Sequence, residues 1–344
     1  MIWANFYILI FKVNRFMNKK QWILYAFCIV SILNIAVFFL MMWSDTYSNI
    51  HPTRKYFFTE PNTRVSRVDY ILKNPTKYDS FIFGSSRVGA IDPLLIHNGI
   101  YYNMTYSEGI PHEHLINIKL FLKSGIKIKN LLIGLGSISY QVSFNKHQKQ
   151  GLTKAHRLAT NTNIFIYYRE LFLRFPSAED RHHITKKIFG GNRVYMDISK
   201  QEERYKKQEA TFSIEQFMTK EHMNDPVFNK PALYNGDFLD ETMADIRDMK
   251  NICTNRHIKC IFFINPIHHK MYEFINKKLF YKFKLELSKI TDYYDFSEQN
   301  YITNNNCYWG DTLHYNREVA DMIIQKIYRN KNDKFGVYIT KGSK

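Results

Sequence analysis

Two short polar segments, far apart in the chain, carry side chains suited to nucleophilic catalysis. Residues 84–87 read GSSR and follow an apolar run, and Asp311 stands three residues before His314. An imidazole can take the proton of a serine hydroxyl, and a carboxylate on its other ring nitrogen holds the required tautomer. Gly-Ser-Ser is common in turns and Asp-x-x-His often arises by chance, so each segment alone says little. Together they are compatible with a serine–histidine–aspartate arrangement in which the serine is a nucleophile, provided that the fold brings them together.

The elements that must position these segments alternate between strands and helices. Five short apolar runs predict strands, at residues 79–83, 100–104, 130–135, 258–264 and 291–296. Apolar side chains at spacings of three and four predict one helix around residues 115–122 and a final helix around 319–327. Continuous apolar strands that alternate with helices indicate an α/β fold with a mostly parallel sheet covered on both faces.

Both polar segments are expected at the carboxyl edge of this sheet, where ligands bind in open α/β folds. GSSR follows the first predicted strand directly, and the Asp-x-x-His segment precedes the final helix. Residues 141–235 interrupt the alternation, because they are rich in charged and amide side chains and show helical patterns without a convincing strand. This interval is interpreted as a helical insertion over the carboxyl edge, where a substrate would lie.

The combination of a first-strand GSS with Asp-x-x-His before the last helix resembles the SGNH/GDSL hydrolase superfamily. The resemblance covers about residues 79–330. It implies a three-layer, flavodoxin-like sandwich, with Ser86 as nucleophile, His314 as base and Asp311 as the residue that orients it. It also implies that the backbone N–H groups of Gly109 and Ser86 stabilise the oxyanion. The chain looks most like a divergent membrane-anchored branch that includes the teichoic-acid D-alanylation protein and alginate-acetylation proteins.

One block of the superfamily pattern is altered. The family usually has Gly-x-Asn-Asp after the third strand, where the asparagine donates to the oxyanion. Here residues 136–139 read GSIS, which places Ile138 at the asparagine position. Ser137 or Ser139 could substitute as donor, or the two backbone N–H groups could suffice. Loss of one such donor costs about two to three orders of magnitude in rate, so a non-catalytic version stays an alternative.

Other residues near these motifs have two interpretations each. Arg87 is a candidate to bind an anionic substrate group or to form a structural salt bridge, and His268 is a candidate substrate-contacting residue after Asn265-Pro266. Asp295 could orient the histidine or simply cap a turn. The pairs 182–183 and 268–269 are histidines without matching carboxylate or cysteine spacing. No metal site and no cofactor are therefore expected.

Residues 22–43 form the one long apolar run, and its length suffices to cross about 30 Å of hydrocarbon. Lys19 and Lys20 precede the run and Asp45 follows it, so the positive-inside rule places the N-terminus in the cytoplasm. The run is too long for a cleaved signal peptide and lacks a small-residue site behind it. We therefore expect an uncleaved signal anchor in a bacterial cytoplasmic membrane, with the rest of the chain outside.

These patterns divide the chain into consecutive parts. Residues 1–21 are expected to be cytoplasmic, with Met17 as an alternative start and an upstream extension before it. The anchor at 22–43 leads into a linker and leading helix at 44–78. The SGNH-like domain covers 79–330 with the insertion at about 141–235, and residues 331–344 form a C-terminal tail.

The composition bears on partners and compartment. The 344 residues carry a formal net charge of +17, which suits an anionic partner. Nucleic acid is not expected, because the anchor places the basic surface outside the cytoplasm. Four cysteines without metal spacing allow at most a Cys253–Cys260 bridge. The expected partners are a cell-envelope glycan or anionic polymer, the lipid bilayer and a multi-spanning membrane acyltransferase.

The sequence thus favours an extracytoplasmic O-acyltransferase or esterase, with O-acetyl as the acyl group that the resemblance implies. The alternative is a non-catalytic accessory protein that uses the same fold to bind envelope polymer or a membrane acyltransferase.

Overall fold

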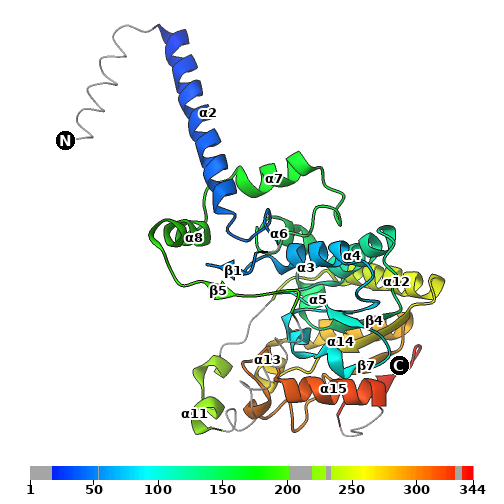
Figure 1. Cartoon of the computed structure of the whole chain (residues 1–344). Helices are drawn as coiled ribbons and strands as arrows, with labels where there is room; N and C mark the ends of the chain where they lie inside the picture. The colour runs from blue at the N-terminus through cyan, green and yellow to red at the C-terminus, as the bar shows by residue number, and fades with distance from the viewer. Residues whose placement is uncertain (1–17, 53, 201–218, 230–233, 330–334, 344) are drawn as a thin grey trace.

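The computed structural model describes residues 18–52, 54–200, 219–229, 234–329 and 335–343. The expected cytoplasmic segment lies outside the described residues, except for residues 18–21. In the described part, one apolar helix rises from a mixed α/β body (Figure 1). Strand β2 (Ser80–Phe83) precedes the first polar segment and helix α15 (Arg317–Arg329) follows the second, and both elements belong to this body.

The central sheet has six strands in the order β3-β2-β4-β6-β7-β8, and all neighbours are parallel except β7 and β8. Their bounds are β2 (Ser80–Phe83), β3 (Tyr101–Asn103), β4 (Asn130–Leu135), β6 (Lys259–Ile264), β7 (Tyr293–Asp295) and β8 (Val337–Ile339). The first five lie inside the five predicted runs. The mostly parallel sheet of the sequence prediction is confirmed.

Strand β8 lies in the segment that was expected to be a tail. Phe335 just before it is fully buried, and it packs against Phe296. Gly336 has φ +78°, and a Cβ there would lie 2.3 Å from the Phe296 ring. A single buried phenylalanine and a glycine therefore return the chain to the sheet edge. Three residues are too few to show a strand periodicity, which is why the sequence pattern did not reveal β8.

Side chains alternate across the sheet and enter two separate hydrophobic clusters. Phe81 and Phe83 contribute to one cluster, whereas Ile82 contributes to the other. The first cluster holds residues of α3 (Thr63–Lys73), α4 (Pro111–Lys123), α12 (Leu239–Asn255) and α14 (Lys277–Ile290). The second holds residues of α15 (Arg317–Arg329), which lies on the other side of the sheet from α3, α4 and α12 (Figure 1). Burial on both faces explains why the strands read as continuous apolar runs.

Short elements connect these helices and strands. They are η1 (Ser86–Ala90), η2 (Pro93–Leu95), α5 (Ile138–Gln141), α6 (Phe144–Gln148), α11 (Lys220–Met223), η3 (Pro226–Asn229), α13 (His269–Phe274) and η4 (Asn306–Tyr308), together with a separate two-stranded pair, β1 (Tyr56–Phe57) and β5 (Val194–Tyr195). Strand β5 lies in the interval for which no strand was expected, and its two residues pair antiparallel with β1.

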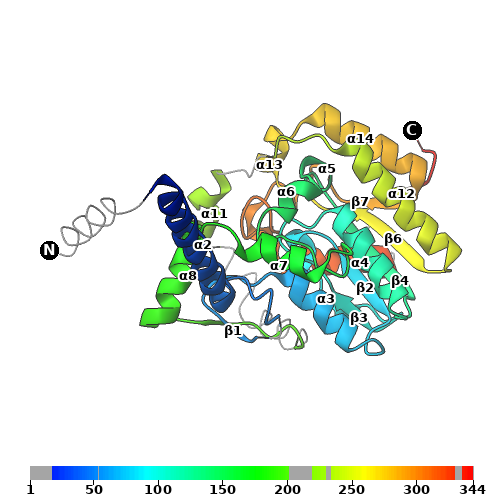
Figure 2. The same cartoon turned by 90° about the horizontal axis from the view of Figure 1, so that it is seen from above.

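Helix α2 (Lys19–Ser44) has the length and composition of a membrane-spanning helix, and the apolar window is not buried in the structure. Its N-terminus carries a capping box in which Asn18 and Gln21 bond each other's backbone N–H groups. This N-terminal apolar helix fits either a membrane anchor or a signal sequence. Helices α7 (Ile164–Phe172) and α8 (Ala178–Phe189) of the insertion contact its C-terminal half (Figure 2).

Different parts of the insertion therefore contact two different regions of the molecule. Its α7 and α8 pack on α2, away from the carboxyl edge of the sheet, whereas residues 219–229 contact the loop that precedes the Asp-x-x-His segment. Residues 219–229 lie beside the candidate site, where the sequence placed the whole insertion, whereas α7 and α8 do not. The physical reason is that the apolar side chains of α7 meet a matching apolar surface on α2.

Candidate active site

The structure brings Ser86, His314 and Asp311 into one hydrogen-bonded chain. Ser86 Oγ lies 2.9 Å from His314 Nε2, although 228 residues separate them in sequence. His314 Nδ1 lies 2.8 Å from Asp311 Oδ2. Since a carboxylate only accepts, Nδ1 carries the proton and Nε2 presents its lone pair to the Ser86 hydroxyl. This is the arrangement in which an imidazole acts as base toward a serine.

The spacing of the Asp-x-x-His segment has a local structural basis. Asp311 Oδ1 accepts hydrogen bonds from the backbone N–H groups of Leu313 at 2.6 Å and His314 at 2.9 Å. The carboxylate therefore turns back over its own loop, and Oδ2 remains for the imidazole. Burial acts to raise the pKa of Asp311, but the bonds from His314 and the backbone outweigh burial and lower that pKa. Asp311 is consequently held as a carboxylate.

Ser86 stands at the first position of η1, after Gly84 and Ser85 that follow the end of β2, and its side chain is exposed. The imidazole of His314 is 42 % exposed, so the pair opens to solvent. No described residue accepts a hydrogen bond from the Ser86 backbone N–H. A nucleophile with a free N–H beside it is one half of an oxyanion site.

Gly109 lies against the nucleophile loop, as its expected role requires. A Cβ on Gly109 would lie 2.4 Å from the carbonyl oxygen of Gly84, so only glycine permits this approach. However, the Gly109 N–H donates to the Tyr106 carbonyl at 3.2 Å and closes a turn. That N–H must be shared or released before it can donate to an oxyanion.

Residues 136–139, the altered block of the superfamily pattern, supply a buried isoleucine and two serine hydroxyls. Ile138 is buried in a small cluster with Ile110 and Val142, so it supports the loop that carries Gly109. Ser139 Oγ accepts the Gly136 N–H at 3.1 Å, which fixes the position of this side chain but leaves its O–H free to donate. The Ser137 hydroxyl has no hydrogen-bond partner among the described residues, and no side-chain cap bond forms there. Both serines considered as substitute donors therefore keep a hydroxyl proton, and Ser137 is the one without a competing hydrogen bond among the described residues.

Arg87 is a buried cation without a carboxylate partner in the described part of the chain. Its side chain is 5 % exposed, and Nη1 approaches within 3.1 Å of the position that a Cβ on Gly136 would occupy. Burial lowers the pKa of the guanidinium, and the nearby Tyr234, Tyr315 and Asp311 oppose part of that effect. The structural salt bridge considered for Arg87 is thus not formed, and its five donors remain available beside the nucleophile.

His268, the candidate substrate-contacting residue, lies in the interior and exposes no side-chain surface. Its ring is fully buried, stacks on Phe228 and meets Trp309 edge-on. Nε2 bonds the Asn306 side chain at 2.8 Å and Nδ1 accepts the Lys270 N–H at 3.3 Å. Burial lowers the pKa of His268 to about 4, so the ring stays neutral. The residue packs under the loop that leads to Asp311. The adjacent His269 and Lys270 are polar, so the sequence did not indicate that His268 is buried.

The remaining candidates also have structural partners. Asp295 forms an ion pair with Lys284 at 2.6 Å and accepts the Ser297 N–H at 2.9 Å, which agrees with the turn-capping interpretation. His183 Nδ1 lies 3.1 Å from Thr59 Oγ1. Among the described residues, no group of three metal-ligating side chains is gathered in one place. All four cysteines are free thiols.

Sequence reasoning missed a buried ionic network behind Gly109. Glu113 Oε1 accepts from Arg64 Nε at 2.8 Å and from His147 Nδ1 at 2.9 Å. His147 Nε2 lies 3.2 Å from Glu108, the residue before Gly109. Burial and Arg64 act to lower the pKa of His147, but bonds to both glutamates outweigh them and raise it. The four residues come from separate elements, so no local spacing signalled them.

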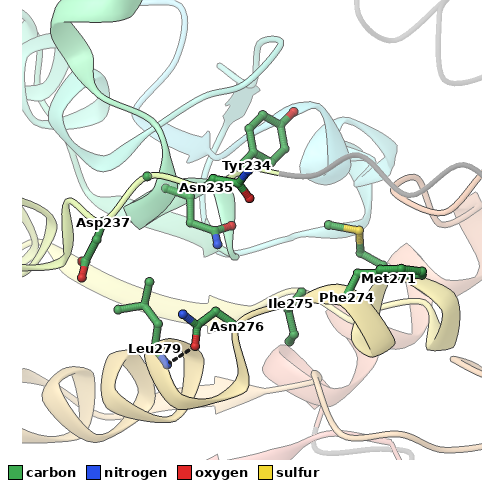
Figure 3. Close-up of a pocket in the computed structure, with 10 residues that line it drawn as sticks. Tyr234, Asn235, Asp237, Met271, Phe274, Ile275, Asn276 and Leu279 are labelled. Carbon is green, nitrogen blue, oxygen red and sulfur yellow. Dashed lines mark hydrogen bonds between the residues drawn. The ribbon is translucent and has the colours of Figure 1, made fainter.

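A pocket of about 250 Å³ lies between α13, α14 and the segment 234–237 that precedes α12 (Figure 3). Asn235, Asp237 and Asn276 supply polar groups, and Phe274 supplies an exposed ring. Tyr234 also lines this pocket, and its hydroxyl donates to Glu108 at 3.0 Å. The pocket is thereby connected to the loop that carries Gly109.

No protein-family model matches this sequence, and no curated protein matches it. The geometry of the site therefore carries the functional argument.

Proposed function

We propose that this chain is a membrane-anchored serine O-acyltransferase or esterase of SGNH type. The observation that carries the proposal is the continuous chain from Ser86 Oγ through the His314 ring to Asp311, with contacts of 2.9 and 2.8 Å. The helices on both faces of a mostly parallel sheet support a three-layer, flavodoxin-like arrangement. The nucleophile follows the end of a central strand, where such folds place their ligands.

The reaction follows from this geometry. His314 Nε2 removes the Ser86 proton as Oγ attacks the acyl carbonyl, and Asp311 stabilises the imidazolium that forms. The Ser86 N–H and the Ser137 hydroxyl, joined by Gly109 once its turn opens, are the donors for the oxyanion. The imidazolium then protonates the leaving oxygen, which yields a Ser86 ester. Water or a sugar hydroxyl, deprotonated by His314, releases the acyl group.

The substrate class follows from charge and location. With α2 as a signal anchor, Lys19 and Lys20 remain cytoplasmic and the α/β body faces the cell envelope. The net charge of +17 and the unpaired Arg87 favour a substrate with an anionic group. A cell-envelope glycan or other anionic polymer fits both features, and the acyl group is proposed to be acetyl.

The test uses the full chain in detergent or nanodiscs and a fluorophosphonate probe that reacts with activated serines. Wild-type protein is expected to be labelled and to hydrolyse a nitrophenyl ester. Ser86→Ala is expected to abolish labelling, and His314→Ala to reduce the rate at least about 10³-fold. Ser85→Ala, which changes the neighbouring serine, is the matched control and should retain labelling. Turnover that survives both Ser86→Ala and His314→Ala would show that this triad is not the site.

The second candidate is a non-catalytic accessory protein that binds envelope polymer or a membrane acyltransferase. It is favoured by Ile138 at the usual asparagine position and by the Gly109 N–H that is engaged with Tyr106. A folded wild-type protein that binds polymer but never reacts with the probe would support this candidate.

A further inference from the structure

Helices α7 and α8 and the segment that connects them expose an unusual set of large apolar side chains. Phe165 of α7 is 82 % exposed, Phe175 of the connecting segment is 93 % exposed and Phe189 of α8 is 82 % exposed. Smaller contributions come from Ile164, Ile166, Leu173 and Ile188. Soluble surfaces rarely expose so many large apolar groups within one stretch of about 25 residues. We call the exposed residues 164–166, 173, 175, 188 and 189 the apolar platform.

The buried face of α7 attaches the platform to α2. Tyr167, Leu171 and Phe172 form a cluster with Met41 of α2. The rings of Phe172 and Phe38 meet edge-on with centroids 6.4 Å apart. Both views show α7 and α8 beside the end of α2 that joins the body (Figures 1 and 2).

The depth of this contact along α2 follows from helix geometry. A helix of 26 residues is about 39 Å long, whereas the hydrocarbon core of a bilayer is about 30 Å thick. If the core begins at Trp22, after the two lysines, it ends near Met41. Phe38 lies six residues before Ser44, which is about 9 Å from the end of the helix. A helix that contacts Phe38 therefore lies at the boundary between acyl chains and headgroups.

Polar groups of α8 lie where headgroups are expected. Lys187 Nζ donates to the carbonyl oxygens of Trp43 and Ser44, and it stands 4.3 Å from the centre of the Trp43 ring. Lys186 lies in the same last turn of α8. A tryptophan in contact with a lysine, together with exposed phenylalanines on the neighbouring segments, is typical of the membrane interface.

The connection between α2 and the body is folded rather than loose. The Asp45 carboxylate accepts the N–H groups of Ile50 and His51 at 3.1 and 3.0 Å. Asn62 Nδ2 donates to Asn49 Oδ1 at 3.0 Å and to the Lys154 carbonyl at 2.7 Å. The position of α2 in the bilayer therefore sets the depth of α7 and α8.

We propose that the apolar platform is a second membrane-binding element, which inserts into the outer leaflet of a phospholipid bilayer beside α2. The platform would hold the α/β body at one height and orientation over the membrane instead of letting it swing on a single helix. This inference rests on α2 as a membrane anchor, but it does not depend on the proposed catalysis.

The experiment measures the depth of single labelled positions in the full chain. Variants Phe175→Cys and Phe189→Cys are made in a Cys28→Ser background, because Cys28 is the exposed native cysteine. Tyr281→Cys on α14, where the native side chain is 67 % exposed, is the matched control. Each variant carries an environment-sensitive fluorophore in vesicles of phosphatidylcholine and phosphatidylglycerol in equal amounts. Lipids with a nitroxide near the headgroup quench buried fluorophores, and aqueous iodide quenches exposed ones.

Lipid nitroxide is expected to quench positions 175 and 189 roughly fivefold more strongly than position 281, with the reverse order for iodide. Equal iodide quenching at all three positions overturns the proposal. Protection of 175 and 189 from both quenchers also overturns it, because a protein partner or a second copy would then cover the platform. Resistance of the chain to carbonate extraction tests the α2 anchor separately. A thermal unfolding midpoint equal to that of the wild type shows that each variant is folded, whether or not Ser86 is reactive.

Discussion

At the scale of single residues, the role of Asp311 can be separated from that of Asp295, the other carboxylate that the sequence allowed. Asp311→Asn removes the acceptor for His314 Nδ1 and favours the wrong tautomer. We expect the ester hydrolysis rate to fall about 10³- to 10⁴-fold with little change in thermal stability. Asp295→Asn is the control, because it breaks the ion pair with Lys284 and should lower stability more than rate. If Asp295→Asn lowered the rate and Asp311→Asn lowered only the stability, Asp295 would be the residue that orients His314.

Arg87 offers a second prediction at the same scale. Arg87→Met removes a buried cation that no described carboxylate neutralises, so the melting temperature should stay equal or rise. The KM for a negatively charged ester is expected to increase roughly 10- to 100-fold, which corresponds to the loss of charge-assisted hydrogen bonds. An uncharged ester should be affected much less. A fall in stability with equal effects on both esters would instead indicate a structural role.

At the scale of elements, the buried network of Arg64, Glu113 and His147 joins α3, α4 and α6 to the loop that carries Gly109. The pKa of His147 is raised above 6.5 in the folded state, so its charged form stabilises the fold fully below pH 6.5. This contribution is lost as the pH rises through the folded pKa. The pKa of Glu108 and Glu113 is lowered, so their contribution is present above pH 4.5 and is lost as the pH falls.

We therefore predict that His147→Asn destabilises the protein by about 2 kcal/mol between pH 5 and 6.5, and by progressively less above pH 6.5. Denaturant unfolding of wild type and variant over this pH range measures the difference. His112→Asn is the control, since His112 pairs with Asp245 in a half-exposed place. A difference that grows with pH would mean that His147 is neutral in the fold.

At the scale of the whole molecule, the helix α2 and the body share an apolar cluster. A chain that begins at residue 45 would uncover Tyr167, Leu171 and Phe172. We expect it to aggregate at concentrations where the full chain in detergent stays monodisperse, as light scattering would show. Leu171→Ser with Phe172→Ser should restore solubility to the truncated chain. If the truncated chain without the serine substitutions were as soluble as the full chain, the apolar cluster would not depend on α2 for burial.

The sequence alone determined the features that depend on local order. An apolar run of some twenty residues specifies α2, and short apolar runs specify the five parallel strands, because backbone hydrogen bonding and burial act on neighbouring residues. The same holds for the Asp311–His314 turn, where a spacing of three lets a carboxylate bond the imidazole and its backbone. The place after the first strand pointed to the GSS segment, and the resemblance to a motif with the serine in third position selected Ser86 over Ser85.

Only the tertiary structure decided which side chains meet. It buried His268 against Trp309, and among the described residues it gave Arg87 no carboxylate partner and gave a hydrogen bond to Ser139 Oγ but none to the Ser137 hydroxyl. It also joined β8 to the sheet through Phe335 and set α7 against α2. These outcomes depend on segments tens to hundreds of residues apart, and their contacts arise from the packing of whole elements. Composition and local spacing do not encode these long-range contacts. Residue types therefore predicted a nucleophilic serine site, whereas tertiary packing determined which side chains contact one another.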